Sequence, residues 1–414
     1  MGVVIIASFG SRPPLAPVLV VWLLGVSQIV GYGTLYYSYA ILAGKAAASL
    51  HWPEPWLFGA FSLGLLLGGL AAPEIGRRID RHSAGAVMTL GSVVAALALI
   101  VASLAPNGLV FAAAVVVMQV AATLVLYDAA FTALVQAAGA GAHQRITQLT
   151  LIAGFASTIF WPLTAWLTSV LDWRAIYLVF ALANLLLCAP LHALIARRPR
   201  PPAAAGEAAR APAPPRADRW LMWLMTLGFA LSGFALSGVL AQMVPLLTAI
   251  GLGGSALFVS ALFGPAQFCI RFGTLFAGRN RHPIVPALVS LAAIPASLAL
   301  LAIGAPAVAA GILFIVVFGF GSGLKSIVQG SLPLALFGPA SYGARLGVMA
   351  SVRQVLASIA PFILASAMEA IGARPALWLV AGIGLLGLAC LAETARRMRR
   401  QAARPHPASG PAAG

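Results

Sequence analysis

The stretch RRPRPPAAAGEAARAPAPPRADR, residues 197–219, divides the chain into two parts of similar length. It contains six arginines and six prolines and no large apolar side chain. Such a segment cannot bury enough surface to fold, so we expect a solvated linker. The flanking residues 17–196 and 220–395 are almost continuously apolar. The sequence therefore predicts two membrane-embedded halves, with residues 1–16 as an N-terminal tail and residues 396–414 as a basic C-terminal tail.

The composition requires a membrane. The chain is 61% hydrophobic and 8% charged, with a mean hydropathy of +0.98, whereas a soluble domain is about 25% charged. A bilayer core of about 30 Å is spanned by roughly 20 helical residues, and the chain offers twelve apolar runs of about that length. We therefore predict an all-α integral membrane protein whose twelve transmembrane helices form two pseudo-symmetric six-helix bundles.

The distribution of the net charge of +16 predicts the orientation. If the loops alternate between the two sides, nineteen Lys and Arg residues lie on the side of the linker, and three, Lys45, Arg174 and Arg374, lie on the other. By the positive-inside rule, the linker and both termini are expected in the cytoplasm. The basic tail is expected to anchor this topology or to contact anionic lipid, with a specific partner site as the alternative. Nucleic-acid binding needs a basic folded surface, and the sequence offers none.

The three cysteines, Cys188, Cys269 and Cys390, all lie inside apolar runs. They predict no disulfide framework, and no Cys/His spacing suggests a metal site, so we expect no cofactor. Arginine outnumbers lysine 23 to 2 and alanine is abundant, which suggests a bacterial genome rich in GC. The membrane is therefore expected to be a bacterial inner membrane.

The first expected helix, at about residues 17–42, has a polar face. Gln28, Tyr32 and Tyr36 follow one another at intervals of four residues, which places them on one side of a helix. We expect this face to meet water or substrate. The alternative is that the tyrosines belong to an interfacial aromatic belt and that Gln28 bonds a neighbouring helix.

Between the second and third expected helices, residues 76–85 read GRRIDRHSAG. This stretch resembles the signature G-x-x-x-D-R-x-G-R-R of the major facilitator superfamily, because Gly76, Asp80 and Arg81 match it in register. The later glycine and the basic pair of the signature are absent. The resemblance implies that Asp80 and Arg81 belong to a cytoplasmic gate that latches the two halves together. Positive-inside charge is the alternative for the arginines, and it leaves Asp80 unexplained.

The second part of the chain repeats the first at an offset close to 200 residues. The residues that recur are Leu57-Phe58 as Leu257-Phe258, Gly33 as Gly233, Arg145 as Arg345, and Arg174 as Arg374. Two parallel six-helix halves joined by a cytoplasmic linker are the architecture of the major facilitator superfamily, which binds substrate near mid-membrane between the halves. The resemblance covers nearly the whole chain.

The fourth expected helix, at about residues 109–137, contains Asp128, the only acid deep inside an expected helix. An ionised Asp within a spanning helix costs about 3 kcal/mol on insertion scales, so it has to face the bundle interior or a wet cavity. We expect Asp128 to act in coupling or gating, with a structural pair to a nearby arginine as the alternative.

Three cations lie inside expected helices of the second half, namely Arg271, Lys325 and Arg353. Each costs about 3 kcal/mol to insert, and Asp128 alone cannot neutralise all three. A bound anion would complete the charge balance. The alternative is that the cations, above all Lys325 and Arg353, snorkel to the cytoplasmic surface.

Within the superfamily, this pattern resembles the monocarboxylate transporters and the oxalate/formate antiporters. The former carry an acid four residues before an arginine in helix 8, where this chain has Gln267 and Arg271. The latter use basic residues in helices 8 and 11, matched in type and approximate position by Arg271 and Arg353. Because Gln267 replaces the acid, proton coupling would pass through Asp128, or the protein would be an exchanger or a uniporter.

The sequence therefore predicts a secondary active transporter, expected to be a monomer, that moves a small organic anion by alternating access with a proton or a counter-anion. The residues expected at the substrate site are Arg271, Arg353, Lys325, Gln28, Tyr32, Tyr36 and Gln267. One alternative is a proton-driven exporter of amphiphilic or cationic compounds that acts through Asp128, and another is a non-transporting receptor. An enzyme is not expected, because no Ser/His, metal-ligand or paired-carboxylate arrangement appears within the helices.

Overall fold

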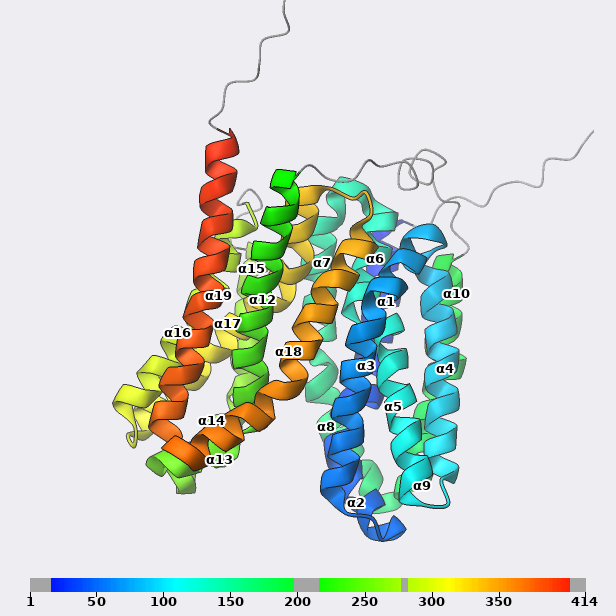
Figure 1. Ribbon diagram of the computed structural model, residues 1–414. Coiled ribbons are helices and arrows are strands. Elements are labelled where there is room, and N and C mark those ends of the chain that lie inside the picture. Colours follow the sequence, from blue (N-terminus) through cyan, green and yellow to red (C-terminus); the bar gives the residue numbers. More distant parts are fainter. Residues whose placement is uncertain (1–15, 197–215, 277–281, 403–414) are drawn as a thin grey trace, which may run out of the picture.

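The computed structural model describes residues 16–196, 216–276 and 282–402, and the regular elements in these ranges are helices (Figure 1). Twelve helices of the described ranges are long and apolar enough to cross a membrane. The predicted all-α fold with twelve spans is therefore confirmed, and the chain is a multi-pass membrane protein. Both expected tails, in part, and the expected linker up to residue 215 lie outside the described residues.

The first half makes six passes. Its elements are α1 (Pro17–Tyr32), the π-helical turn η1 (Gly33–Tyr37), α2 (Tyr39–Leu50), α3 (Glu54–Arg81), α4 (Ala84–Leu104), α5 (Gly108–Val125), α6 (Tyr127–Ala138), η2 (Gly139–Gly141), α7 (Ala142–Ala153), α8 (Phe155–Val170), α9 (Trp173–Ala183), η3 (Asn184–Cys188) and α10 (Ala189–Ala196). The helices α1, η1 and α2 together form the first pass, and α5 with α6 forms the fourth.

The second half follows the same plan. Its elements are α12 (Arg216–Ala241), α13 (Met243–Leu247), η4 (Thr248–Leu252), η5 (Gly253–Ser255), α14 (Ala256–Ala261), α15 (Phe263–Phe276), α16 (Ile284–Gly304), α17 (Val308–Phe337), α18 (Tyr342–Ile371) and α19 (Ala373–Ala402). The backbone kinks at Gly251, whose φ of 97° favours glycine. The helix α12 begins inside the range expected for the linker, and α19 continues past the expected boundary at residue 395.

The two halves stand side by side with their ends on one side of the molecule. The start of α1, the end of α10, the start of α12 and the end of α19 lie at the top of Figure 1. We name this side the linker side and the opposite side the far side. The helices α3 and α18 run together on the linker side and diverge toward the far side, where α18 bends away. The halves therefore contact each other mainly in the linker-side part.

Buried apolar side chains form three clusters. One lies in the first half and includes Phe111, and one lies in the second half and includes Phe314. The third contains side chains of both halves, among them Phe131 and Val328. The shared cluster fixes the way in which the halves meet, because its side chains are removed from lipid and water alike.

The two halves have an equivalent arginine contact in their far-side turns. Arg174 donates hydrogen bonds from Nη1 to the carbonyl oxygens of Ser103, at 2.7 Å, and Ala105, at 2.8 Å. Arg374, which recurs at the offset of 200, donates from Nη2 to the carbonyl oxygen of Ala305. Ala105 and Ala305 directly follow α4 and α16. Each half therefore uses an arginine to satisfy carbonyl groups at the end of its third pass.

Candidate functional site

The fourth pass is broken at Leu126. This residue has φ −83° and ψ −163°, which is extended backbone, so α5 ends at Val125 and α6 begins at Tyr127. The sequence carries no signal for the break, since the pass contains no proline and no glycine after its first residue. The break places Asp128 in the first turn of α6. Free backbone N–H groups and the positive end of the helix dipole stabilise a negative charge there.

Asp128 of the first half forms an ion pair with Arg353 of the second half. Arg353 Nη2 donates to Asp128 Oδ2 at 2.8 Å, and the two side chains are 18% and 17% exposed. At a rise of 1.5 Å per residue, Asp128 and Arg353 both lie about 15–17 Å from the linker-side ends of their helices. The structural pair considered for Asp128 is thus present. Because it joins α6 to α18, it has to break whenever the halves separate at this depth.

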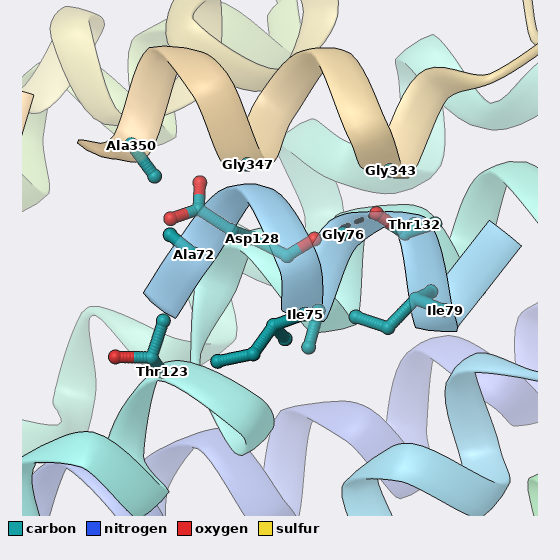
Figure 2. A pocket seen from close by; sticks show the side chains of 11 residues that line it. Ala72, Ile75, Gly76, Ile79, Thr123, Asp128, Thr132, Gly343, Gly347 and Ala350 are labelled. Atoms are coloured by element: carbon teal, nitrogen blue, oxygen red, sulfur yellow. Dashed lines mark hydrogen bonds between the residues drawn. The ribbon is translucent and has the colours of Figure 1, made fainter. Parts of the chain in front are cut away.

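A small cavity borders the same carboxylate (Figure 2). Asp128 Oδ1 has no hydrogen-bond partner among the described residues. The cavity measures about 10 Å³, which is close to the space of one water molecule. It is lined by Ala72 and Gly76 of α3, by Gly347 of α18 and by Thr123 of α5, so it lies between the halves.

Asp80 of the signature stretch also contacts the other half. Its Oδ1 accepts a hydrogen bond from the backbone N–H of Gly343 at 3.0 Å, and its Oδ2 accepts one from Ala344 at 2.7 Å. These N–H groups belong to the first turn of α18, where they have no partner within the helix. A Cβ at Gly76 would overlap the carbonyl oxygen of Gly343, so the glycine permits the close approach of α3 to α18. Arg81, which ends α3 beside this contact, is exposed. The gate role of Gly76, Asp80 and Arg81 stays a prediction.

Arg271 lies on α15 and faces α7 of the first half. The residue is 8% exposed, and its Nε has no hydrogen-bond partner among the residues that the structure describes. Its Nη2 donates to Oε1 of Gln267 at 3.1 Å, and its Nη1 is 3.5 Å from the carbonyl oxygen of Thr150. Gln267 Nε2 in turn donates to Ser322 Oγ at 2.9 Å. Within the described ranges, no acidic side chain forms an ion pair with Arg271. Gln267 therefore orients a guanidinium whose charge is not compensated.

Lys325 lies on α17 and is 4% exposed. A Cβ at Gly233 of α12 would lie 3.0 Å from Lys325 Nζ and 3.3 Å from Cγ of Arg353, so the two cationic side chains pack against the same point of α12. No hydrogen bond or ion pair to Lys325 is found in the part of the chain that the structure describes. Lys325 therefore does not snorkel to the linker-side surface in this conformation.

Tyrosines of the first half connect these charged groups. The ring centroid of Tyr32 lies 4.8 Å from that of Tyr127 and 6.2 Å from that of Tyr37, and the centroid of Tyr36 lies 5.5 Å from that of Tyr37. Tyr37 and Tyr127 lie within electrostatic reach of Arg271, and Tyr32 lies within electrostatic reach of Asp128 and Arg353. Tyr36 is 43% exposed. We name Tyr32, Tyr36, Tyr37 and Tyr127 the tyrosine cluster.

The sequence indicated only part of this cluster. Tyr37 does not follow the four-residue spacing of Tyr32 and Tyr36. The chain around it forms the π-helical turn Gly33–Tyr37, which changes the phase of the helix. Residues 33–37 read GTLYY. This combination of a glycine and two adjacent tyrosines is the sequence signal that could have indicated an irregular turn.

Gln28 is buried inside the first half. It is 0% exposed, and its Nε2 donates to the carbonyl oxygen of Val125 at 2.7 Å. This is the arrangement considered as the alternative, in which Gln28 bonds a neighbouring helix. Of the seven residues expected at the substrate site, Arg271 and Gln267 contact each other directly, and Lys325 and Arg353 are neighbours.

No metal site accompanies these residues. Within residues 16–196, 216–276 and 282–402, no group of three or more His, Cys, Asp or Glu side chains is placed to hold a metal ion. Among the described residues, the chemistry available where the halves meet is therefore that of cations, the carboxylates of Asp80 and Asp128, amides and phenol groups. This chemistry suits binding of a charged ligand and proton transfer.

Two like six-helix halves that enclose charged side chains where they meet define the fold of a membrane transporter. Family comparison agrees, because the model described as Major Facilitator Superfamily matches residues 21–361. The chain belongs to the Major Facilitator Superfamily. A non-transporting receptor is not supported by this membership.

Solved structures of the same fold are similar to this chain over nearly its full length. The human organic anion transporter MFSD10 (TETRAN) has a TM-score of 0.70 at 18% identity, covering 92% of this chain and 100% of its own. A variant of the E. coli fucose:proton symporter FucP has a TM-score of 0.66 at 17% identity, covering 92% and 99%. FucP in the outward conformation has a TM-score of 0.66 at 15% identity, covering 91% and 99%. Comparison with curated protein sequences gives no match.

Proposed function

We propose that this protein is a secondary transporter that moves a small organic anion, with a carboxylate as the first candidate, across a bacterial inner membrane by alternating access. The observation that carries the proposal is a charge imbalance between the halves. Arg271 and Lys325 are both buried, and neither has an acidic partner in the described residues.

The nearby acid cannot correct this imbalance. Asp128 is already engaged with Arg353 at 2.8 Å. A buried cation without a partner costs several kcal/mol even after relaxation, and an arginine cannot lose its proton. An anion that enters between the halves would remove this cost, so ligand binding would stabilise the state in which the cations are enclosed.

The residues around Arg271 suggest how an anion would be held. The guanidinium Nε is unpartnered, and Gln267 fixes the guanidinium through Nη2. We propose that the carboxylate pairs with Arg271 and approaches Lys325, while the hydroxyl groups of Tyr32 and Tyr36 line its approach from the far side. Arg353 would join the site when Asp128 releases it. Gln28 is left out of this set, because its amide group donates to Val125.

The contacts between the halves support a proposal for the side on which the site opens. Asp80 and the Asp128–Arg353 pair hold the linker side together, and α3 and α18 diverge toward the far side. We propose that the linker side, with both termini, is cytoplasmic, on the grounds of the positive-inside rule. The conformation would then face outward. We also propose a monomer in which each half of the chain, on either side of the linker, moves as one domain.

The resemblance to the monocarboxylate and oxalate/formate branch supports a carboxylate through Arg271 and Arg353. One structural neighbour is described as an organic anion transporter, but at 18% identity it supports the fold alone. The substrate proposal therefore depends on the cations of this chain.

A second candidate function is proton-driven export of amphiphilic or cationic compounds through Asp128. The observation that favours it is the unpartnered Oδ1 of Asp128 beside a cavity between the halves. A proton on this carboxylate would cancel its attraction to Arg353. Such an exporter would fail when Asp128→Asn is introduced and would keep working in Arg271→Gln.

The test is binding of a panel of carboxylates, from formate and oxalate to lactate and benzoate, to the purified protein, measured as a shift in melting temperature. A ligand at 100 times its dissociation constant stabilises the folded state by about 2.7 kcal/mol. We expect at least one carboxylate to raise the melting temperature of the wild type and to have no effect on Arg271→Gln.

The matched control is Arg174→Gln, which removes the same charge from a far-side turn. It should keep the carboxylate shift. An equal shift in Arg271→Gln and the wild type contradicts the anion site. Shifts from cationic amphiphiles alone, lost in Asp128→Asn, would favour the exporter.

A further inference from the structure

Residues of the first pass stabilise the helix break in the fourth pass. When a helix is interrupted, the carbonyl groups of its last turn lose their N–H partners. Here Gln28 of α1 donates Nε2 to the carbonyl oxygen of Val125, the last residue of α5, at 2.7 Å. Because both groups are buried, water cannot take the place of the glutamine, and an unsatisfied carbonyl would be costly.

Neighbouring residues of α1 contact the break as well. A Cβ at Gly31 would lie 3.2 Å from Cδ2 of Leu126. The absence of a side chain at Gly31 therefore leaves space for the side chain of Leu126. The ring of Tyr32 packs on that of Tyr127, the first residue of α6, at 4.8 Å between centroids. Three consecutive residues of the fourth pass therefore each meet the same stretch of α1.

The break decides where the carboxylate of Asp128 lies. A helical residue has ψ near −42°, whereas Leu126 has ψ −163°, so the chain leaves α5 in a new direction. Asp128 becomes the second residue of α6, and its Oδ2 meets Arg353 Nη2 across the gap between the halves. In an unbroken helix the backbone N–H of Asp128 would be bonded within the helix, and the side chain would point elsewhere.

We infer that Gln28 is a positioning residue that holds the helix break and thereby holds Asp128 against Arg353. Its bond to Val125 links α1 of the first half to an ion pair that joins both halves. Gln28 thus acts through Asp128 rather than on a substrate. The consequence for transport rests on the proposed function, in which release of Arg353 by Asp128 is a step of the cycle.

The test is a double-mutant cycle in melting temperature, measured on the purified protein without any ligand. Gln28→Met removes the hydrogen bond and keeps a side chain of similar shape. The matched control is Gln119→Met, because Gln119 is also buried and donates Nε2 to a backbone carbonyl oxygen, that of Leu35, at 2.7 Å. Gln119 lies on α5, about two helical turns before the break. Each glutamine variant is measured alone and combined with Asp128→Asn.

We expect both glutamine variants to lower the melting temperature by about 3 °C. In the Asp128→Asn background the effect of Gln28→Met should fall to about half or less, since the ion pair that Gln28 positions is already lost. The effect of Gln119→Met should be unchanged. Equal, additive effects of the two glutamine variants would overturn the inference and leave Gln28 with a purely structural role.

Gly31→Ala serves as a second variant if Gln28→Met does not fold. The added Cβ presses on Leu126 and disturbs the break without removing the hydrogen bond. Its effect should also shrink in the Asp128→Asn background, and full additivity would again overturn the inference. Since no ligand is used, a failed carboxylate screen does not affect this cycle, and a failed cycle leaves the carboxylate screen intact.

Discussion

Two contacts between the halves differ in how their charges are matched. In the contact of α3 and α6 with α18, which we name the carboxylate contact, Asp80 meets backbone N–H groups and Asp128 meets Arg353. In the contact of α7 with α15, which we name the arginine contact, Arg271 meets a backbone carbonyl oxygen and an amide group of its own helix. In the first contact each carboxylate faces a donor of the other half. The second has an excess of positive charge, and this difference points to where a ligand is needed.

The largest effect is expected from breaking the carboxylate contact at its ion pair. Arg353→Gln leaves the partly buried Asp128 without its cation and should lower the free energy of unfolding by about 3 kcal/mol. The measurement is thermal or denaturant unfolding in detergent. The double variant Arg353→Gln with Asp128→Asn should regain most of the loss, and a double variant as unstable as the single one would contradict the pairing.

An arginine-to-glutamine substitution in the arginine contact should raise the free energy of unfolding instead of lowering it. Arg271→Gln removes a buried charge that has no partner, so the ligand-free protein should gain about 1–2 kcal/mol of stability while losing carboxylate binding. Unfolding with and without the carboxylate found in the screen measures both effects. A loss of stability comparable to that of Arg353→Gln would remove the distinction between the two contacts.

A smaller effect is expected at the linker-side end of the carboxylate contact. Asp80→Asn keeps the size of the side chain and weakens its charge-assisted bonds to Gly343 and Ala344, at a cost of about 1 kcal/mol. The linker side should open more often. The probe is Thr132→Cys, a residue that is 1% exposed and lines the cavity between the halves. Labelling of this cysteine should become faster in Asp80→Asn than in the parent with Asp80, and an unchanged rate would show that Asp80 does not close this side.

The smallest effect concerns packing. A Cβ at Gly273 of α15 meets nothing within 4 Å, whereas one at Gly76 overlaps the backbone of α18. Gly273→Ala should therefore stabilise the protein by about 0.5–1 kcal/mol through the helix preference of alanine, and Gly76→Ala should destabilise it. Unfolding curves of the two variants test whether the close approach of α3 to α18 depends on Gly76, with exposed Gly273 as the control.

Much of this arrangement could be predicted from the sequence. The apolar runs predicted the twelve spans, and the three cations were expected inside helices of the second half before their surroundings were known. The signature stretch drew attention to Asp80, which does lie between the halves. These features depend on local sequence, either on hydrophobicity or on a short motif.

The rest depends on contacts between distant parts of the chain. The break at Leu126 is not marked by a proline or a glycine. The glutamine that bonds the end of α5, Gln28, lies 97 residues before Val125. Which cation pairs with Asp128 is decided by the docking of two halves, because Arg353 is 225 residues away. We expected all polar residues on one face of the first helix to meet water or substrate. In the structure Gln28 on this face is buried, whereas Tyr36 is exposed.

The hydrogen bonds of Arg174 and Arg374 in the far-side turns bear on how the two halves can move. Arg174 and Arg374 each bind carbonyl groups of their own half. The polar contacts described between the halves lie instead toward the linker side. Each bundle is thus tied into one piece at the far end and joined to the other near the linker end. In a rocking cycle each bundle would rotate as a rigid body. The free-energy cost of separating the linker-side ends would then come from the few polar contacts between the halves.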